Sequence, residues 1–192
     1  MARRINNISV RNFNVEKKMK KILLSIPLLS VILITTILSY FLLQNKNPNK
    51  PPSALLNKEL PIFETSDLFN KKNFLNNSDI NKSKSLINFF ASWCIPCKAE
   101  HELFFELKKI QPKLLIVGIN HKDKENDAIN FLNENGNPYD FVGIDKNGKI
   151  AFEFGVFGLP ETFITNNEGK IIYKYIGPLN KKIIKNEIIP LL

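Results

Sequence analysis

The sequence predicts an α/β fold, with helices covering both faces of a mixed β-sheet, preceded by one membrane-spanning helix. Three observations carry this prediction. Short apolar runs alternate with helical segments in the order β-α-β-α-β, followed by a strand hairpin and a last helix. An uncharged, apolar stretch covers residues 22–43. The only two cysteines, Cys94 and Cys97, lie where a predicted strand meets a predicted helix.

The apolar stretch 22–43 is predicted to be an uncleaved membrane anchor. As a helix it would span about 33 Å, enough for a hydrocarbon core of about 30 Å. Residues 1–21 hold seven basic side chains against Glu16 alone, which predicts that they stay in the cytoplasm. The alternative is a cleaved signal peptide, whose apolar region is usually about 7–15 residues and ends in a small-residue cleavage site. The exit at Tyr40–Gln44 has no such site.

The rest of the chain divides into a linker and one domain. Residues 44–53 are polar and proline-rich, which predicts a semi-rigid spacer. Residues 54–192 are long enough for a single hydrophobic core. Of the net charge of +9, +6 lies in residues 1–21, and the domain shows no basic and aromatic constellation, so no nucleic-acid partner is predicted.

Apolar periodicity predicts the elements of the domain. The segment 69–84 is predicted to be loop, with one helical turn at 77–81, and 166–169 a hairpin turn. Pro190 is predicted to interrupt the last helix. The expected strands are 60–64, 86–91, 114–119, 141–144, 162–165 and 170–176, and the expected helices are 94–109, 123–135, 151–154 and 180–192.

Two thiols separated by two residues at a helix start predict a dithiol/disulfide redox site. Cys94 is expected to be exposed and Cys97 covered. At the helix N-terminus the pKa of the Cys94 thiol can fall well below the free value of about 8.5, which makes Cys94 the attacking thiol and Cys97 the resolving one. Pro96 fits the first helical turn. Trp93 offers a flat apolar surface for docking a partner peptide.

Other readings of the two cysteines are possible. A structural disulfide rarely spans two residues at a helix start. A zinc site needs two further ligands, for which only His101 and His121 are present, and a copper site would combine two thiols with one histidine. Haem attachment requires a histidine directly after Cys97, where Lys98 stands. The sequence therefore predicts neither a metal nor a cofactor.

A second segment supports the redox reading. Pro160 stands directly before a predicted strand, 63 residues after Cys97. The plain interpretation is a proline at the first position of a strand. A cis peptide bond at Pro160 would instead be a specific feature, and would leave the backbone of Leu159 free to pair with a substrate strand opposite the cysteines.

These segments together resemble a known family. Leu86–Glu106 resembles a thioredoxin-fold active site, and the Pro160 segment resembles its cis-proline loop. The motifs WCIPCKAEH (93–101), GNPY (136–139) and GVFGLPETF (155–163) resemble those of the CcmG/DsbE family of cytochrome c maturation. The resemblance covers about 60–192, together with the order of anchor and domain.

The resemblance implies a periplasmic thiol-disulfide oxidoreductase on a single-pass anchor in a bacterial inner membrane. It would reduce the haem-binding cysteines of apocytochrome c or a cytochrome c assembly factor, and receive electrons from an inner-membrane reductase of the DsbD type. Carried over to this chain, Cys94 is the nucleophile, Cys97 the resolving thiol and Pro160 the cis-proline. Spacing and composition alone allow electron flow in either direction.

One position departs from ordinary thioredoxin. Six residues before the first cysteine, thioredoxin has a buried aspartate that assists proton transfer to the second thiol, and this chain has Asn88. An amide cannot act as that base. Glu100 and Glu161 are the candidates to replace it, because burial would raise the pKa of either and let it shuttle the Cys97 proton.

Two other functions are compatible with the sequence. The first is a general periplasmic thiol oxidant or isomerase. An oxidant of the DsbA kind would carry a large helical insertion, for which 98–159 has little room. The second is a copper-delivery module that uses the two thiols as ligands.

Overall fold

The computed structural model describes residues 25–43, 54–80 and 83–192. Its contacts divide the chain into two compact units, Met1–Lys46 and Asn47–Leu192. The predicted cytoplasmic segment 1–21 and linker 44–53 lie outside the described residues.

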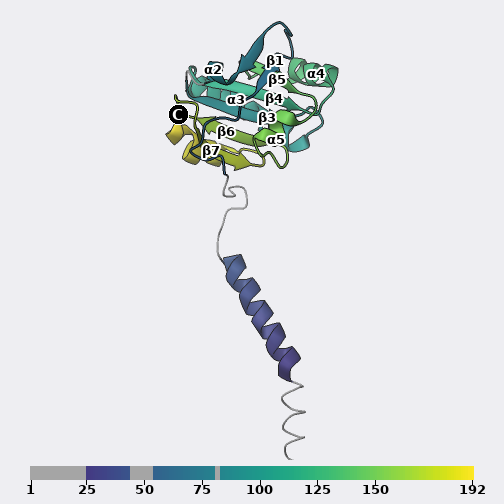
Figure 1. The fold of residues 1–192 in the computed structure, drawn as a ribbon, viewed down its shortest axis with the longest axis vertical. Helices are drawn as coiled ribbons and strands as arrows, with labels where there is room; N and C mark the ends of the chain where they lie inside the picture. Colours follow the sequence, from purple (N-terminus) through teal and green to yellow (C-terminus); the bar gives the residue numbers. More distant parts are fainter. Residues whose placement is uncertain (1–24, 44–53, 81–82) are drawn as a thin grey trace, which may run out of the picture. The chain divides into compact units, whose positions relative to one another are not determined.

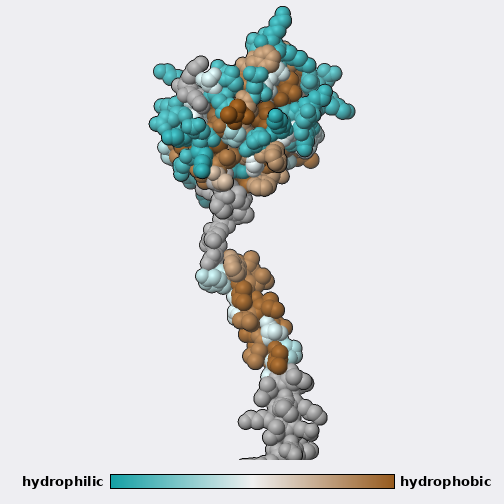
Figure 2. Space-filling view, in the orientation of Figure 1, coloured by the Kyte–Doolittle hydropathy of each residue, from teal (hydrophilic) through white to brown (hydrophobic). Residues whose placement is uncertain are grey.

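The N-terminal unit contains an apolar helix over Ser25–Leu43, which is long and apolar enough to cross a membrane. It falls within the predicted anchor 22–43, whose first three residues are not among those described. Its apolar side chains are exposed along its length, as Figure 2 shows. The hydroxyls of Ser30, Thr35 and Thr36 donate to backbone carbonyls one turn earlier, so these polar groups are satisfied without water.

The second unit is built on a five-stranded sheet with the order β5-β4-β3-β6-β7 (Figure 1). β3, β4 and β5 are parallel, whereas β6 and β7 run antiparallel to their neighbours. All six residues of the central strand β3 are buried, as expected for a short apolar run covered on both faces. The strands are β3 (Ser85–Phe90), β4 (Leu115–His121), β5 (Phe141–Asp145), β6 (Glu161–Thr165) and β7 (Ile171–Ile176).

One face of the sheet is covered by α3 (Ile95–Ile110), α4 (Glu125–Asn135) and the C-terminal helical segment. The crossovers β3-α3-β4 and β4-α4-β5 step in the same direction along the sheet, so right-handed connections place both helices on one face. We call this the α3 face. Its core includes Leu86, Phe104 and Leu132, and both cysteines lie in it.

The opposite face, which we call the α5 face, is covered by α5 (Lys149–Glu153), α2 (Asn77–Ile80) and an N-terminal hairpin of β1 (Glu64–Ser66) and β2 (Phe74–Asn76). Phe89, Phe154 and Phe163 form tilted and edge-to-face ring contacts in its core. The predicted fold class, a mixed sheet with helices on both faces, is confirmed.

The predicted elements differ from the structure mainly before β3. The strand expected at 60–64 begins only at Glu64, because Leu60 and Phe63 are buried in the α5-face core and Pro61 has no N–H to donate. The short strand β2 lies in the segment predicted as loop. The helical turn predicted at 77–81 is present as α2, with position 81 outside the described residues.

The C-terminal helix is also irregular. Asn180 caps it by accepting from the N–H of Ile183. The chain then runs through α6 (Lys181–Ile183), a π-helical turn at Ile184–Ile188 and a 3₁₀ turn at Ile189–Leu191 that contains Pro190. The helix predicted over 180–192, interrupted at Pro190, is therefore three short helical segments.

Candidate dithiol active site

Cys94 and Cys97 form a disulfide at the N-terminus of α3. The cap position is occupied by Cys94, which has an extended backbone, and Cys94 Sγ accepts from the N–H of Cys97 at 3.2 Å. Pro96 lies in the first turn, where no N–H is required. The N–H groups at this helix end stabilise negative charge at the Cys94 sulfur.

The expected difference in exposure between the two cysteines is absent from this disulfide-bonded form. Cys94 is 4% exposed and Cys97 3% exposed. The prediction that Cys94 is exposed was therefore wrong for the oxidised site, because its side chain turns in over the first turn of α3 and joins the α3-face core.

The loop before Cys94 is held by Lys122 and Asp123, the two residues that directly follow β4. The Asp123 carboxylate accepts from the N–H and the hydroxyl of Ser92, at 2.6 and 2.9 Å. Trp93 Nε1 donates to the Lys122 carbonyl, while 59% of Trp93 remains exposed. Trp93 thus presents an exposed, fixed aromatic surface directly beside the disulfide.

Glu100 is fully buried on α3, one turn after Cys97. Its Oε1 accepts from Asn88 Nδ2 at 2.9 Å, and its Oε2 accepts from the Leu179 N–H at 2.6 Å. Asn88 Nδ2 also donates to Thr162 Oγ1, and Asn88 Oδ1 accepts from the Tyr139 hydroxyl at 2.9 Å. The residue that replaces the thioredoxin aspartate is therefore the centre of a buried network that holds Glu100.

Burial raises the pKa of Glu100 from 4.5 to about 7, although the donors at Leu179 and Asn88 oppose the rise. Burial likewise raises the pKa of Tyr139, with a smaller contribution from the Glu100 charge, so the phenol keeps its proton and donates it to Asn88. This fixes the amide orientation of Asn88, with its nitrogen toward Glu100. Glu100 is thus poised to exchange a proton near neutral pH, as predicted for a buried carboxyl.

Pro160 follows a cis peptide bond with Leu159 and directly precedes β6. Antiparallel pairing places Glu161 opposite Phe89, so Pro160 lies beside the end of β3, from which the chain continues to Cys94. Within the described chain, no hydrogen bond engages the backbone N–H or carbonyl of Leu159. The half-buried Leu159 side chain contacts both cores.

Glu161 is also fully buried, but its surroundings differ from those of Glu100. Its Oε1 accepts from the N–H groups of Phe157 and Gly158, at 2.6 and 3.2 Å. Its Oε2 lies 3.0 Å from Lys174 Nζ. The two groups form an ion pair, but their angles do not meet the geometry of a hydrogen bond. Lys174 Nζ donates to the Gly155 carbonyl at 2.7 Å.

The two glutamates predicted as alternative bases lie on opposite faces of the sheet. Alternate residues of β6 point to opposite faces. Thr162 reaches Asn88 on the α3 face, whereas Glu161 and Phe163 point to the α5 face. Glu100 therefore lies on the same face of the sheet as the dithiol, within α3. Glu161 lies on the opposite face and contacts the loop 155–160.

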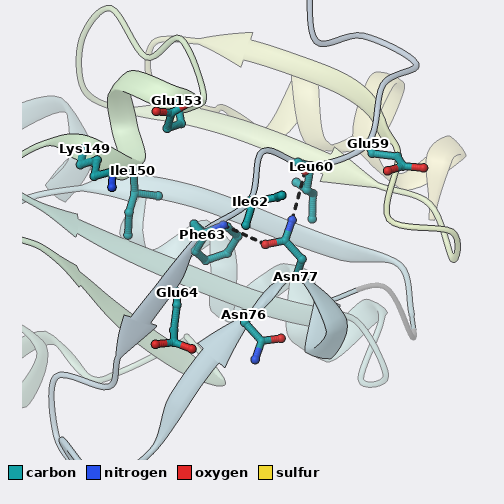
Figure 3. A pocket seen from close by; sticks show the side chains of 10 residues that line it. All are labelled: Glu59, Leu60, Ile62, Phe63, Glu64, Asn76, Asn77, Lys149, Ile150 and Glu153. Carbon is teal, nitrogen blue, oxygen red and sulfur yellow. Dashed lines mark hydrogen bonds between the residues drawn. The ribbon is translucent and has the colours of Figure 1, made fainter.

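Two hollows flank these elements. A groove of about 480 Å³ is bordered by Leu159 and the exposed Phe157 on one side and by His121 and Lys122 on another. A larger cavity of about 700 Å³, shown in Figure 3, lies between residues 59–64, β2, α2 and α5. In this larger cavity Asn77 bonds Leu60 and Phe63, and none of the predicted site residues lines it.

The two histidines considered as metal ligands are both engaged. His101 is buried, its ring nitrogen bonds the Gly136 carbonyl at 2.9 Å, and burial lowers its pKa. His121 Nδ1 lies 3.0 Å from Asp145 Oδ2. Both imidazoles therefore have structural contacts within the fold.

Sequence reasoning missed three residues of the site. Tyr139 and Thr162 belong to the motifs GNPY and GVFGLPETF, but nothing in their spacing indicates contact with Asn88. Lys174 is a single charged residue in the apolar strand IIYKYI, and that pattern is the one signal of its burial.

Comparison with known proteins agrees with this site. A model of the redoxin family matches residues 55–188. The thiol:disulfide interchange protein HelX of Rhodobacter capsulatus is 40% identical over 154 residues, which cover 80% of this chain and 86% of HelX. The thiol:disulfide interchange protein DsbE of Escherichia coli strain K12 is 36% identical over 177 residues, which cover 90% of this chain and 95% of DsbE. The chain belongs to the redoxin family, in its CcmG/DsbE group.

Membership in the CcmG/DsbE group confirms the resemblance found in the sequence and the predicted enzyme class, a thiol-disulfide oxidoreductase. Solved structures agree on the fold. A DsbF homologue from Corynebacterium diphtheriae, 20% identical, has a TM-score of 0.63 and covers 78% of this chain and 98% of that protein. A secreted thiol-disulfide isomerase from Corynebacterium glutamicum, also 20% identical, has a TM-score of 0.63, with 77% and 96% covered.

Proposed function

We propose that this CcmG/DsbE-group protein is the membrane-anchored reductant of a cytochrome c maturation system. In this role it reduces the haem-binding cysteines of apocytochrome c, or a cytochrome c assembly factor, on the periplasmic side of a bacterial inner membrane. The observation that carries the proposal is the Cys94–Cys97 disulfide at the start of α3, with the buried Glu100 one turn beyond it. Identities of 35–40% to HelX and to DsbE proteins over most of the chain support the pathway.

The exchange proceeds in two steps that use only the sulfurs of the chain and its substrate. The Cys94 thiolate attacks one sulfur of the substrate disulfide, forms a mixed disulfide and releases the first substrate thiol. The Cys97 thiolate then attacks Cys94 Sγ, which closes the Cys94–Cys97 disulfide and releases the second substrate thiol. Two electrons pass from the dithiol to the substrate, and a partner dithiol must reduce the site again.

Glu100 accepts the Cys97 proton in the second step. It lies one turn from Cys97 on the same face of α3, and its pKa of about 7 matches the pH at which proton transfer is needed. Asn88 and Leu179 hold the carboxyl in place, so the thioredoxin aspartate is replaced by a glutamate from the neighbouring helix.

Substrate docks between Trp93 and Leu159. The exposed Trp93 ring supplies apolar contact beside the sulfur. The backbone of Leu159, next to Pro160, has no hydrogen bond to any described residue, and it pairs with the extended substrate chain in the manner of an added strand.

The basic residues 1–21 and the apolar helix favour a cytoplasmic N-terminus, a single-pass anchor and a periplasmic domain. A reducing dithiol in that oxidising compartment requires electrons from the membrane. We propose an inner-membrane reductase of the DsbD type as their source.

Trapping tests the proposal directly. The variant Cys97→Ala, expressed as the full chain in its host, stops the reaction at the mixed disulfide on Cys94. Apocytochrome c or a cytochrome c assembly factor should be recovered with it under non-reducing conditions. The variant Cys94→Ala is the control and should recover neither. Recovery of general secreted proteins alone would count against the cytochrome c pathway.

The redox potential separates a reductant from an oxidant. A reductant should have a potential close to that of thioredoxin, about −270 mV, and far from that of DsbA, about −120 mV. Equilibration of the protein with glutathione or dithiothreitol buffers measures it. A value near the oxidising end would favour a general oxidant.

A further inference from the structure

We infer that Lys174 and Glu161 form a positioning pair that holds the loop 155–160 in shape, and so sets how tightly the protein binds a disulfide-bonded peptide. The inference rests on the proposed function in one respect, since it takes the loop to contact the substrate. It assigns Glu161 to substrate binding through the loop, and leaves proton transfer to Glu100.

Glu161 anchors the middle of the loop. Its Oε1 accepts from two successive backbone N–H groups, those of Phe157 and Gly158, which lie four and three residues earlier in the chain. Charge-assisted bonds of this kind are about twice as strong as neutral ones. Phe157 is 85% exposed, so the bonds fix its backbone while most of the residue faces solvent and can contact a partner.

Lys174 anchors the start of the same loop. It enters from the neighbouring strand β7, donates to the Gly155 carbonyl at 2.7 Å and lies 3.0 Å from Glu161 Oε2. Its ammonium is also 5.2 Å from the centre of the Phe157 ring and 5.1 Å from that of Phe163. The loop is therefore bound at Gly155 by the cation and at Phe157 and Gly158 by the anion.

The pair is buried, and this distinguishes it from an ordinary surface ion pair. The Lys174 side chain is 3% exposed and that of Glu161 is not exposed at all. A surface pair contributes little, whereas removing one partner of a buried pair leaves an uncompensated charge inside the protein. The partners of the Glu161 carboxyl are two backbone N–H donors and the Lys174 ammonium, so each oxygen faces a positive partial or full charge.

The pair is also separated from the proton chemistry. Glu161 and Lys174 lie on the α5 face with Phe163, whereas Glu100, Asn88 and Thr162 lie on the α3 face. Loss of the pair should therefore change the shape of the loop and leave the titration of Glu100 in place.

The test compares Lys174→Met and Glu161→Gln with the wild-type full chain in detergent. Each protein is first reduced and then mixed with a peptide that contains an internal Cys-x-x-Cys disulfide. Trp93, the single tryptophan, reports the rate in one turnover. We expect the half-saturating peptide concentration to rise about tenfold, because Lys174→Met removes the charge-assisted bond to Gly155 and Glu161→Gln makes the acceptor of the two loop N–H groups neutral. The limiting rate, the rate with a small aromatic disulfide and the pH profile of both should not change.

A matched control is available on the same hairpin. Lys170 forms an exposed ion pair with Glu168 at 3.1 Å, and Lys170→Met should leave the half-saturating concentration unchanged. If a single variant fails to fold, the double variant Glu161→Gln/Lys174→Met leaves no unpaired charge and should fold. It should still bind peptide weakly, because the bond from Lys174 to Gly155 is absent.

Two results would overturn the inference. One is an unchanged half-saturating concentration in both Lys174→Met and the double variant. The other is a shifted pH profile, or a slower reaction with the small disulfide, in Glu161→Gln. Failure of the cytochrome c assignment would be recognised separately, because the wild-type protein would then not prefer a haem-motif peptide to insulin. The half-saturating concentrations of variant and wild type could still be compared with either substrate.

Discussion

Glu100 combines complete burial with hydrogen bonds to both carboxyl oxygens. Such a group couples the chemistry of the site to the stability of the fold, because the folded and unfolded chains bind its proton differently. Two predictions at this residue separate the two effects.

The first prediction concerns stability. The folded pKa of Glu100, about 7, is higher than the unfolded value of about 4.5, so its stabilising contribution is fully present below about pH 4.5 and is lost as the pH rises through 7. The loss amounts to about 3 kcal/mol. In Glu100→Gln, the fall in unfolding free energy between pH 5 and pH 8 should be smaller by about this amount. Urea unfolding followed by Trp93 fluorescence measures it.

The exposed neighbour Glu102 is the control for this experiment, and Glu102→Gln should keep the wild-type dependence on pH. An equal dependence in Glu100→Gln and wild type would show that Glu100 titrates normally.

The second prediction concerns rate. As the proposed base, Glu100 can accept a proton only above its pKa, so the closing step in wild type should accelerate as the pH rises through about 7. In Glu100→Gln this acceleration should disappear, and the step should be slower by about 10²-fold at pH 8. Decay of a pre-formed mixed disulfide on Cys94 measures it. A variant that retains the acceleration would exclude Glu100 as the base.

At the scale of elements, the strand β4 makes room for the buried network. Gly118 lies beside Asn88 in the pairing of β3 with β4. A Cβ atom at Gly118 would come within 2.9 Å of both the Phe90 and the Tyr139 rings, which stack at 4.9 Å. The Tyr139 hydroxyl can reach Asn88 because β4 has no side chain at this point.

Gly118→Ala should therefore destabilise the protein by about 1–3 kcal/mol, the usual effect of overpacking, and slow the closing step by displacing Tyr139. Chemical denaturation and the mixed-disulfide decay measure the two effects. At Gly158 an added Cβ meets nothing within 4 Å, so Gly158→Ala should leave stability within about 0.5 kcal/mol of wild type. Equal stability of the two variants would contradict the packing argument.

The start of α5 is a second feature of this scale. Asp145, at the end of β5, accepts from the N–H groups of Ile150 and Ala151 and from His121. Burial alone would raise its pKa, but these bonds outweigh it and lower the pKa. Its contribution is therefore present above the unfolded pKa of about 3.9 and is lost as the pH falls through the lowered folded value.

Asp145→Asn should cost about 1–2 kcal/mol at pH 7, and less at pH 3, where the wild-type contribution is weakened. Urea midpoints at the two pH values test this. Asp127 lies exposed in the first turn of α4, and Asp127→Asn should change stability by a few tenths of a kcal/mol. A cost at Asp145 that is equal at both pH values would count against the capping role.

For the whole molecule, the chain consists of an apolar helix and a compact domain that begins by Asn47. A chain that starts at residue 47 should be found in the soluble fraction, whereas the full chain should sediment with membranes. The shorter chain should reduce a peptide disulfide with a kcat/KM within about twofold of the full chain in detergent, because every described contact of the dithiol site lies after residue 47. Fractionation and the peptide assay test this. Lost activity in the shorter chain would mean that the anchor contributes to the site.

Patterns in the sequence predict those parts of the fold that have continuous apolar runs or regular apolar spacing. β3 and β4 are nearly continuous apolar segments, and α3 has buried side chains at helical spacing, so each is predicted within a few residues. β2 is a three-residue strand between polar residues, and only its pairing with β1 defines it. Local propensity carries no information on such a partner.

The site shows the same limit. The cysteines are predicted because their chemistry requires close spacing along the chain. Lys174, Tyr139 and Asn88 act through contacts between residues 12 to 74 positions apart, such as Asn88–Glu100 and Asn88–Thr162. Only the register of the strands brings these residues together, so single-sequence reasoning identifies Glu161 and leaves its cation unassigned.

Alternation along β6 has a consequence for how this protein can diversify. Thr162 faces the Asn88–Glu100 network, and the preceding residue Glu161 faces the loop 155–160. With the roles proposed above, the sheet separates reactivity from partner choice. A library confined to 155–158 and Lys174 should therefore yield altered client preference at a constant redox potential, because Leu159 and Pro160 beside the dithiol stay unchanged.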